Sequence, residues 1–378
     1  MMTCPVTGRQ PRMRLPPAFH AFGLCLVGMA FALFGFNVPN LSACEIQKSS
    51  KDSQIFQRHL IGPCSVDDRR RVAVSAESLL QALQDGKSLD LRGIVVEGDL
   101  MLDRLPLESL PHALQGSPRV RRIVDERHVE TGRVISGSIT MQDVVVQGNW
   151  ATNLRNGLLV LFGPFAVTGT RFEQSIDHSH TLFLQAFDFS DSVIRYEGFF
   201  VGAYFDQSAR FSKTTFGTHS RFHQAQFAQV ANFMESRFHG LAEFLEVVFS
   251  QQANFSGVQF QMGTGFSGTH FNGPALFSRA RFQREVFFRF ARFRRQANFA
   301  GTTFEAVSDF SEASFSGTPD FSRAKFHTAP ELSHANLDEQ VFAASKFKQL
   351  SGKLVFLFTF LGICCVVAWG VQKWRKTW

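Results

Sequence analysis

The sequence lacks the motifs that carry most enzyme chemistry. It contains no G-x-S-x-G nucleophile elbow, no phosphate-binding loop, no Cys/His spacing typical of zinc and no cluster of Asp residues. Its 12 His residues are scattered, and the one close pair, His178 and His180, is a weak signal for a metal. We therefore predict a protein that is not an enzyme, with no catalytic residues, no cofactor and no metal site.

Tyrosine is also scarce, since two Tyr accompany 44 Phe. From Phe205 onward a large apolar residue recurs at alternating intervals of six and five residues, in two series that each have a period of eleven. The first series is Phe205, Phe216, Phe227, Phe238, Phe249, Phe260, Phe271, Phe282, Phe293, Phe304, Phe315, Phe326 and Leu337. The second is Phe211, Phe222, Phe233, Phe244, Phe255, Phe266, Phe277, Phe288, Phe299, Phe310, Phe321 and Leu332. A fixed period without insertions predicts a solenoid, whose units bury their apolar faces against their neighbours.

An eleven-residue period is also typical of a right-handed helical coiled coil. The composition argues against it, because the repeats are rich in Phe, Thr, Ser and Gly and poor in Leu, Glu and Lys. Glycines such as Gly257, Gly263 and Gly265 would also weaken a helix. The pattern therefore favours a β-helix, in which the Phe rings of successive coils stack about 4.8 Å apart.

The residues around each Phe share a further pattern. A small residue often lies two positions before the Phe, Asn or Asp directly before it, and Ser directly after it, as in Ala231-Asn232-Phe233, Ala253-Asn254-Phe255-Ser256-Gly257, Ala297-Asn298-Phe299 and Ser308-Asp309-Phe310-Ser311. This unit resembles that of the pentapeptide-repeat family, Ala-(Asp/Asn)-(Leu/Phe)-x-x. The resemblance implies an all-β fold, a right-handed, four-sided parallel β-helix with the Phe and the small residue pointing inward. Every second unit here has one extra residue, so we expect a coil of about 22 residues with the extra residue at a corner.

The same register predicts how the chain is divided. We expect a leader at 1–44, an N-terminal cap region at 45–88 with a short capping helix at 75–85, and degenerate coils at 89–160 interrupted by an inserted loop at 106–133. The regular repeat should occupy 161–338, where His178 is the exception to the apolar register. We expect a linker at 339–353, a transmembrane helix at 354–371 and a basic tail at 372–378.

Two segments are apolar enough to be membrane helices. Residues 19–36 follow a stretch with three Arg and no acid, the layout of a signal peptide or signal anchor. Residues 354–371 form an uninterrupted apolar run near the lower length limit for a spanning helix. We therefore expect the protein to be membrane-anchored, with the repeats on the extracytoplasmic (periplasmic) side and the C-terminus in the cytoplasm.

Of the six Cys, only Cys44 and Cys64 fall in the part expected to be exported. An oxidising compartment would permit a disulfide between them. Alternatively, Leu41-Ser42-Ala43-Cys44 resembles a bacterial lipobox, which would make Cys44 a lipidated residue, although Pro39 and its neighbours interrupt the preceding apolar run. A third possibility is that neither modification occurs.

The net charge is +7, and its most uneven feature is a group of arginines within about one coil. The group is opposed there only by Glu285 and consists of Arg279, Arg281, Arg284, Arg289, Arg292, Arg294 and Arg295. We expect a basic patch that binds anionic lipid headgroups, an acidic polymer or a partner protein. The alternative is a solvated face balanced by the next coil, which carries Glu305, Asp309, Glu312 and Asp320.

These observations predict a non-enzymatic, membrane-anchored scaffold or binding surface in the cell envelope, with a protein partner or an anionic lipid or polymer and no nucleic-acid partner. The resemblance suggests two alternatives. Some pentapeptide-repeat proteins mimic DNA and protect DNA gyrase, but such a rod should be acidic, dimeric and cytoplasmic. Others occur beside membrane segments, which suggests an accessory subunit of a membrane sensor or channel.

Overall fold

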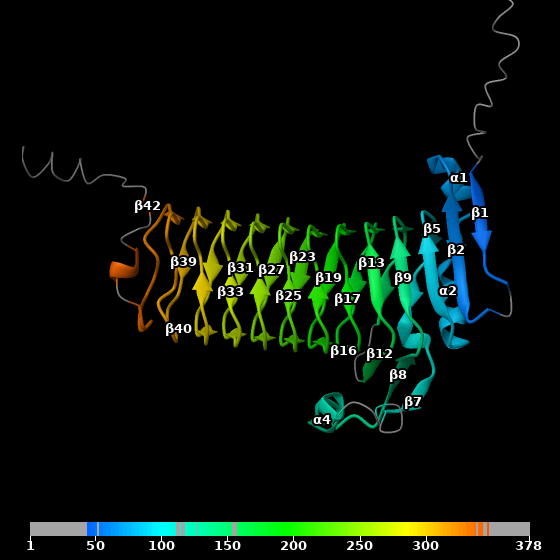
Figure 1. Ribbon diagram of the computed structural model, residues 1–378, viewed down its shortest axis with the longest axis horizontal. Helices are drawn as coiled ribbons and strands as arrows, with labels where there is room; N and C mark the ends of the chain where they lie inside the picture. Colours follow the sequence, from blue (N-terminus) through cyan, green and yellow to red (C-terminus); the bar gives the residue numbers. More distant parts are fainter. Residues whose placement is uncertain are drawn as a thin grey trace, which may run out of the picture. The chain divides into compact units, whose positions relative to one another are not determined.

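The computed structural model describes residues 44–50, 53–110, 114, 118–126, 128–152, 157–337, 339–342 and 346–347. These residues belong to the unit Cys44–Trp378, which is distinct from the unit Met1–Ala43. Four sheets run along this unit and are called A to D in the order in which the chain meets them (Figure 1). Successive strands pair in parallel throughout, except at β1–β2 and β7–β8, which are antiparallel.

Sheets A and B contain the following strands. Sheet A consists of β1 (Glu45–Lys48), β2 (Ile55–Ile61), β4 (Ser88–Arg92), β9 (Ile139–Gln142), β13 (Phe165–Thr168), β17 (Phe187–Asp188), β21 (Ala209–Arg210), β25 (Ala231–Asn232), β29 (Ala253–Asn254), β33 (Ala275–Leu276) and β37 (Ala297–Asn298). Sheet B consists of β3 (Val74–Ser75), β5 (Val95–Glu97), β10 (Val145–Val146), β14 (Arg171–Phe172), β18 (Val193–Ile194), β22 (Thr215–Phe216), β26 (Arg237–Phe238), β30 (Gln259–Phe260), β34 (Arg281–Phe282), β38 (Thr303–Phe304), β41 (Lys325–Phe326) and β42 (Lys346–Phe347).

Sheets C and D complete the coil. Sheet C consists of β6 (Leu100–Met101), β11 (Trp150–Ala151), β15 (Ile176–Asp177), β19 (Glu197–Phe199), β23 (His219–Arg221), β27 (Leu241–Glu243), β31 (Thr264–Gly265), β35 (Val286–Phe287) and β39 (Ser308–Asp309). Sheet D consists of β7 (Leu107–Ser109), β8 (Thr131–Ile135), β12 (Leu158–Leu161), β16 (Thr181–Phe183), β20 (Tyr204–Phe205), β24 (Gln226–Phe227), β28 (Val248–Phe249), β32 (His270–Phe271), β36 (Arg292–Phe293) and β40 (Ser314–Phe315).

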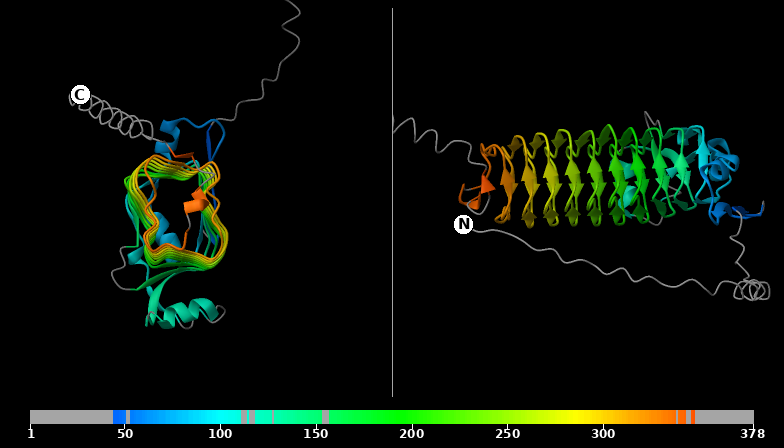
Figure 2. Two further views of the ribbon diagram at one scale, coloured as in Figure 1. Left: turned by 90° about the vertical axis from the view of Figure 1, so that its left-hand side faces the viewer. Right: turned by 90° about the horizontal axis from the view of Figure 1, so that it is seen from above.

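One coil of this parallel β-solenoid takes 22 residues. Phe216 pairs with Phe238, and Phe238 with Phe260, so each residue lies beside its equivalent in the next coil. This is the coil length expected from two eleven-residue periods. Because the chain passes through A, B, C and D in turn, sheet A lies opposite sheet C and sheet B opposite sheet D (Figure 2). The right-handed winding stays a prediction.

The corners explain the alternation of five and six residues. After the Phe of sheet A and the Phe of sheet C, one residue adopts positive φ, for example Lys213 at 57° and Gln224 at 54°. This left-handed residue turns the chain tightly, and the next inward Phe follows five residues after the last. The other two corners, from B to C and from D to A, take six residues, so the extra residue lies at a corner as expected.

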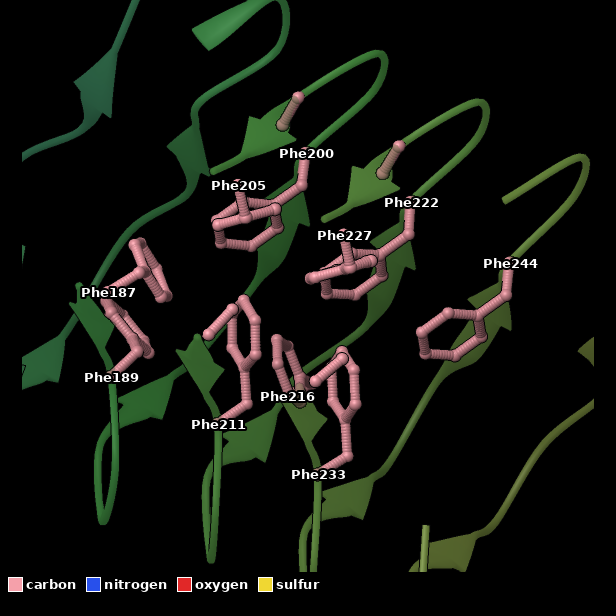
Figure 3. Close-up of a cluster of buried hydrophobic side chains, with 14 of the residues drawn as sticks. Phe187, Phe189, Phe200, Phe205, Phe211, Phe216, Phe222, Phe227, Phe233 and Phe244 are labelled. Atoms are coloured by element: carbon pink, nitrogen blue, oxygen red, sulfur yellow. The ribbon is translucent and has the colours of Figure 1, made fainter. Parts of the chain in front are cut away.

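The core is a set of aromatic ladders (Figure 3). Equivalent rings in successive coils stack face to face, with Phe211 and Phe233 at 4.7 Å and 1°. Rings from opposite sheets meet edge to face, with Phe222 and Phe233 at 5.5 Å and 87°. The small residues that precede the Phe, such as Ala231 and Ala242, are also buried. Both arrangements are ones that aromatic pairs favour, so the Phe period fixes the register of every coil.

A helix closes the N-terminal end of the solenoid. Helix α2 (Ala76–Gln84) begins after Ser75, whose hydroxyl accepts a hydrogen bond from the Ser78 N–H, and its leucines Leu79, Leu80 and Leu83 are buried. Ahead of it, helix α1 (Val66–Arg71) has a reciprocal capping box between Ser65 and Asp68, which the sequence analysis did not predict.

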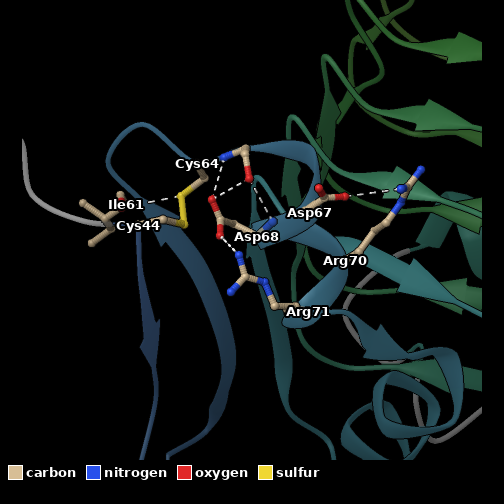
Figure 4. Close-up of polar contacts among 8 residues, drawn as sticks. Cys44, Ile61, Cys64, Asp67, Asp68, Arg70 and Arg71 are labelled. Atoms are coloured by element: carbon tan, nitrogen blue, oxygen red, sulfur yellow. Dashed lines mark hydrogen bonds and ion pairs between the residues drawn. A yellow bond between two sulfur atoms is a disulfide. The ribbon is translucent and has the colours of Figure 1, made fainter.

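The first strands are joined by a disulfide between Cys44 and Cys64, whose Cα atoms are 4.9 Å apart (Figure 4). It links the residue directly before β1 to a residue in the turn that follows the end of β2. A Cys44 sulfur in a disulfide has no valence left for the lipid thioether that the lipobox alternative requires.

The other end of the core is covered by residues that we expected to be a linker. Within 339–353, the described part forms a 3-10 turn, η2 (Glu339–Phe342), and strand β42, which pairs with β41. The Phe342 ring lies 4.7 Å from Phe321 and 5.6 Å from Phe326, so it caps the aromatic core. The linker prediction is therefore wrong for these residues, because an apolar side chain at the open end gains burial.

The segment 106–133 is more ordered than the inserted loop that we expected. Turn η1 (Leu102–Arg104) leads into β7, which pairs with β8. Helix α4 (Pro118–Glu126) lies in the sequence between these two strands. Residues from Thr131 onward already belong to sheet D through β8. The insertion builds a second apolar cluster on the outside of sheet D, formed by Leu110, Leu114, Val120, Ile123, Val124, Val134, Leu158, Val160, Leu182, Leu184 and Tyr204.

Both expected membrane segments, 19–36 and 354–371, lie outside the described residues. Among the residues that are described, no helix is long and apolar enough to cross a bilayer. Membrane anchoring therefore stays a prediction.

Candidate binding surface

The seven arginines expected to form one patch lie on different sides of the coil. Arg281 is on β34 of sheet B, whereas Arg292, eleven residues later, is on β36 of sheet D. Arg279 and Arg284 occupy the two corners that flank sheet B, and Arg289 follows β35 of sheet C. Residues eleven apart in a 22-residue coil face opposite directions, so the seven do not form the single patch that we expected.

Two of the seven arginines form ion pairs with acidic residues of the next coil. The Arg281 Nε–H donates to the Glu305 carboxylate. The Arg289 Nε lies 3.7 Å from Asp309 Oδ2. The arginines on sheets B and C are thus partly balanced by acids of the next coil, as the alternative of a solvated, balanced face predicts.

Three arginines on sheet D differ from these. Arg292, Arg294 and Arg295, called here the sheet D arginines, are exposed, and no ion pair to them occurs in the part of the chain that the structure describes. Sheet D and the turns after its strands contain no Asp or Glu over five successive coils, in the segments Gln226–Val230, Val248–Gln252, His270–Pro274, Arg292–Gln296 and Ser314–Thr318. The positive charge is therefore uncompensated on the strands of sheet D and the turns after them, whereas Glu246 and Glu312 lie at the corners that precede β28 and β40.

The pKa of His270 is affected by two of the same arginines. It lies beside Arg292 in the ladder of sheet D. Burial, together with the charges of Arg292 and Arg294, lowers the pKa of His270. A third cation is thus disfavoured there, while an anion would be attracted.

The insertion forms a groove with the same sheet. Helix α4 projects from the sheet D side of the coils (Figures 1 and 2). The groove has a volume of about 370 Å³ and is lined on the helix by Arg122, Ile123 and Glu126 and on the sheet side by Tyr204, Gln226, Ala228, Gln229, Ser250 and Gln251. The sequence analysis missed this groove, although the spacing of Val120, Ile123 and Val124 is typical of one apolar helix face.

A polar cluster on sheet C is centred on one carboxylate. Glu243 Oε2 lies 2.7 Å from His219 Nε2, 2.9 Å from Arg221 Nε and 3.4 Å from His223 Nε2. Partial burial opposes ionisation, but hydrogen bonds from His219 and Arg221 lower the pKa of Glu243, so the carboxylate is charged. One carboxylate shared by three bases is an ion cluster rather than a catalytic pair.

The two histidines of the close pair do not act together. His178 occupies a Phe position inside the core, against Phe165 at 5.3 Å, and desolvation lowers its pKa to about 3. His180 lies at a corner, with φ of 55°. Across the described ranges, no group of three or more His, Cys, Asp or Glu side chains is placed to hold a metal ion.

Comparison with known proteins identifies the repeats. Residues 222–270, 233–280 and 266–314 match a family model described as Pentapeptide repeats (9 copies). The match supports a place in the pentapeptide-repeat family. A search of curated proteins found no match, and neither did a search of solved structures.

Proposed function

We propose that this solenoid of pentapeptide repeats is a non-enzymatic binding scaffold and that sheet D is its binding face. The observation that carries the proposal is the asymmetry of charge. Acids on neighbouring coils pair with Arg281 and Arg289, whereas the sheet D arginines face solvent on the same sheet as a groove, two coils beyond it. Unpaired cations on a strand face that carries no acids of its own attract anionic ligands.

The core favours this role. The Phe ladders place equivalent side chains of sheet D one coil apart, at a spacing of about 4.8 Å. Because both inward positions of each strand are close-packed, the outward side chains are held in fixed positions before any ligand arrives. Such preorganisation lowers the entropy that binding would cost.

The sequence supports a further part of the proposal. We propose that residues 19–36 and 354–371 anchor the protein in a membrane, with right-handed repeats on the periplasmic side. The three arginines ahead of the first segment support this orientation, and the length of the second is near the lower limit for a spanning helix. The Cys44–Cys64 disulfide agrees with an oxidising compartment.

The proposal is tested by cross-linking the full-length protein in cells and identifying the products by mass spectrometry. The test variant is Arg292→Gln, Arg294→Gln and Arg295→Gln. The matched control is Arg237→Gln, Arg281→Gln and Lys325→Gln, which removes three positive charges from sheet B on the opposite side.

We expect a reproducible cross-linked product that the sheet D variant loses and the sheet B control retains. Equal loss in both variants would assign the interaction to net charge instead of to sheet D. Equal retention in both would refute sheet D as the binding face.

A further inference from the structure

We infer that the ligand of sheet D is an extended acidic polysaccharide that runs along the solenoid axis from the groove to the sheet D arginines. This inference rests on the proposed function and names the chemistry of its ligand. It is carried by three features of the face: its amide groups, its arginines and the helix that overhangs it.

The groove offers groups that recognise sugar hydroxyls. Its sheet side carries Gln226, Gln229, Ser250 and Gln251. Each glutamine amide provides two donors and one acceptor oxygen, and a serine hydroxyl provides both functions, so together they match neutral hydroxyl groups. The two ionisable residues of the helix wall, Arg122 and Glu126, carry opposite charges.

Beyond the groove, the face becomes cationic. Strand β36, which carries Arg292, lies two coils beyond β28 in sheet D. At the spacing of parallel strands this is a distance of about 10 Å, which an extended polymer spans with a few monomers. Arginine is suited to carboxylate groups, because its fork can donate two parallel hydrogen bonds.

Other polyanions fit this face less well. Single-stranded nucleic acid is usually held by exposed aromatic side chains on which bases stack. On the five strands of sheet D from β24 to β40, the Phe residues point inward and are buried, and His270 is the outward aromatic ring. With the exposed Phe290 at the corner before β36, these rings do not form a row on which successive bases could stack.

A bilayer and a protein partner also fit poorly. Helix α4 projects from the same side and would hold a flat membrane away from the arginines (Figure 2). On the strands of sheet D and the turns after them, the largest apolar side chains that point outward are Val230 and Val248, and at the corner before β36 Phe290 is 53% exposed. These scattered side chains are too few for membrane insertion or for the apolar centre of a protein interface.

The inference is tested by measuring binding of the full-length protein to oligogalacturonate of defined length, a sugar polymer with one carboxylate per monomer. Dextran is the uncharged control, and oligo(dT) and phosphatidylglycerol vesicles are the competing polyanions. We expect oligogalacturonate to bind at least about tenfold more tightly than dextran, because dextran lacks the charge-assisted hydrogen bonds that each contribute about tenfold or more. We also expect it to bind more tightly than oligo(dT), because the bases find no row of exposed aromatic side chains to stack on.

Variants assign the two parts of the site. The sheet D variant Arg292→Gln, Arg294→Gln and Arg295→Gln should weaken oligogalacturonate binding by about tenfold or more, and the sheet B control should change it less than about twofold. Gln226→Ala with Gln251→Ala should weaken oligogalacturonate binding and leave residual oligo(dT) binding unchanged. Circular dichroism of each variant checks that the coils are intact.

Tighter binding of oligo(dT) or of the vesicles would overturn the inference, as would an unaltered affinity in the sheet D variant. If oligogalacturonate does not bind but the sheet D variant still loses its cross-linked product in cells, the polysaccharide inference fails and the proposed function stands. If the sheet D variant changes neither measurement, both fail.

Discussion

The stability of the coils should depend on single rings at the centre of the aromatic ladders, and Phe255 is the clearest case. Its side chain is completely buried. Five rings surround it: those of Phe233 and Phe277 stack on its faces at 4.9 and 5.0 Å, and those of Phe244, Phe266 and Phe249 meet it edge to face at 5.3, 5.3 and 5.8 Å.

The expected cost of Phe255→Ala follows from these contacts. Removing a buried Phe costs about 3–5 kcal/mol through lost burial and the cavity left behind. Each favourable aromatic pair adds about 0.5–1.5 kcal/mol beyond burial. The range for a core Phe already includes the loss of typical ring contacts, so five lost partners place this variant at its upper end, about 5 kcal/mol. Phe255→Leu keeps most of the volume and should cost about 1.5 kcal/mol.

Native-state hydrogen exchange measures this cost locally, which suits a solenoid whose coils contact only their neighbours. The Phe255 N–H donates to the Leu276 carbonyl oxygen, so amides of β29 and the adjoining β25 and β33 should lose the most protection. Amides of β13, several coils away, should change little. A loss below about 1.5 kcal/mol in the alanine variant, or a loss spread evenly over all coils, would refute the ladder as the source of stability.

Three further predictions concern other parts of the chain. The pKa of buried His178 is lowered from 6.5 to about 3, so between these values the unfolded chain binds a proton that the folded chain does not. Stability should fall as the pH falls through this window, by up to about 1.4 kcal/mol per pH unit from this group. His178→Phe should therefore reduce the loss of stability between pH 7 and pH 4 in urea unfolding, and an unchanged loss would contradict the assignment. Phe290 is 53% exposed, and its φ of 58° lies in the left-handed region, which costs a residue with a Cβ about 1–2 kcal/mol. Phe290→Gly should therefore raise stability by about 1 kcal/mol in thermal unfolding, and a decrease would contradict the presence of backbone strain at this corner. The Cys44–Cys64 disulfide closes a loop with a sequence separation of 20, which restricts the unfolded chain. Replacing both Cys by Ser should therefore lower the free energy of opening β1 and β2, measured by hydrogen exchange, by about 3 kcal/mol. An equal decrease in β29 would contradict a local role for the disulfide.

The sequence was sufficient for the coil because one physical demand repeats along it. Each Phe must point into the same narrow core, so the spacing of Phe determines the number of residues per coil. The corner residues fit the same logic: a residue such as Lys213 takes positive φ where five residues separate two Phe, and the six-residue spacing occupies the wider corner. The capping helix was predictable from its serine N-cap and its buried leucines.

The distribution of charge was harder to predict from the sequence. Proximity in sequence placed all seven arginines in one coil, but a coil that turns at four corners sends Arg281 and Arg292 to opposite sides. Counting positions on a 22-residue wheel would have separated them. The pairing of Arg281 with Glu305 depends on the next coil and becomes visible only once the register is known.

The two remaining differences are at irregular segments. Helix α4 lies in a segment rich in Pro and charge, which favoured a loop, although its apolar residues have helical spacing. Phe342 lies beyond the repeat, where periodicity no longer applies, and its role depends on the open end of the core that it covers. Periodicity therefore determines the coils, whereas tertiary contacts determine what covers them.

The central claim, that sheet D is the face occupied in the cell, is tested most directly by arginine footprinting. Intact cells and purified protein would be treated with phenylglyoxal, and the modification of each arginine measured by mass spectrometry. We predict that Arg292, Arg294 and Arg295 are protected in cells relative to the purified protein, while Arg237 and Arg279 on the other sides react equally in both. Equal reactivity of all five arginines in cells and in purified protein would contradict the account.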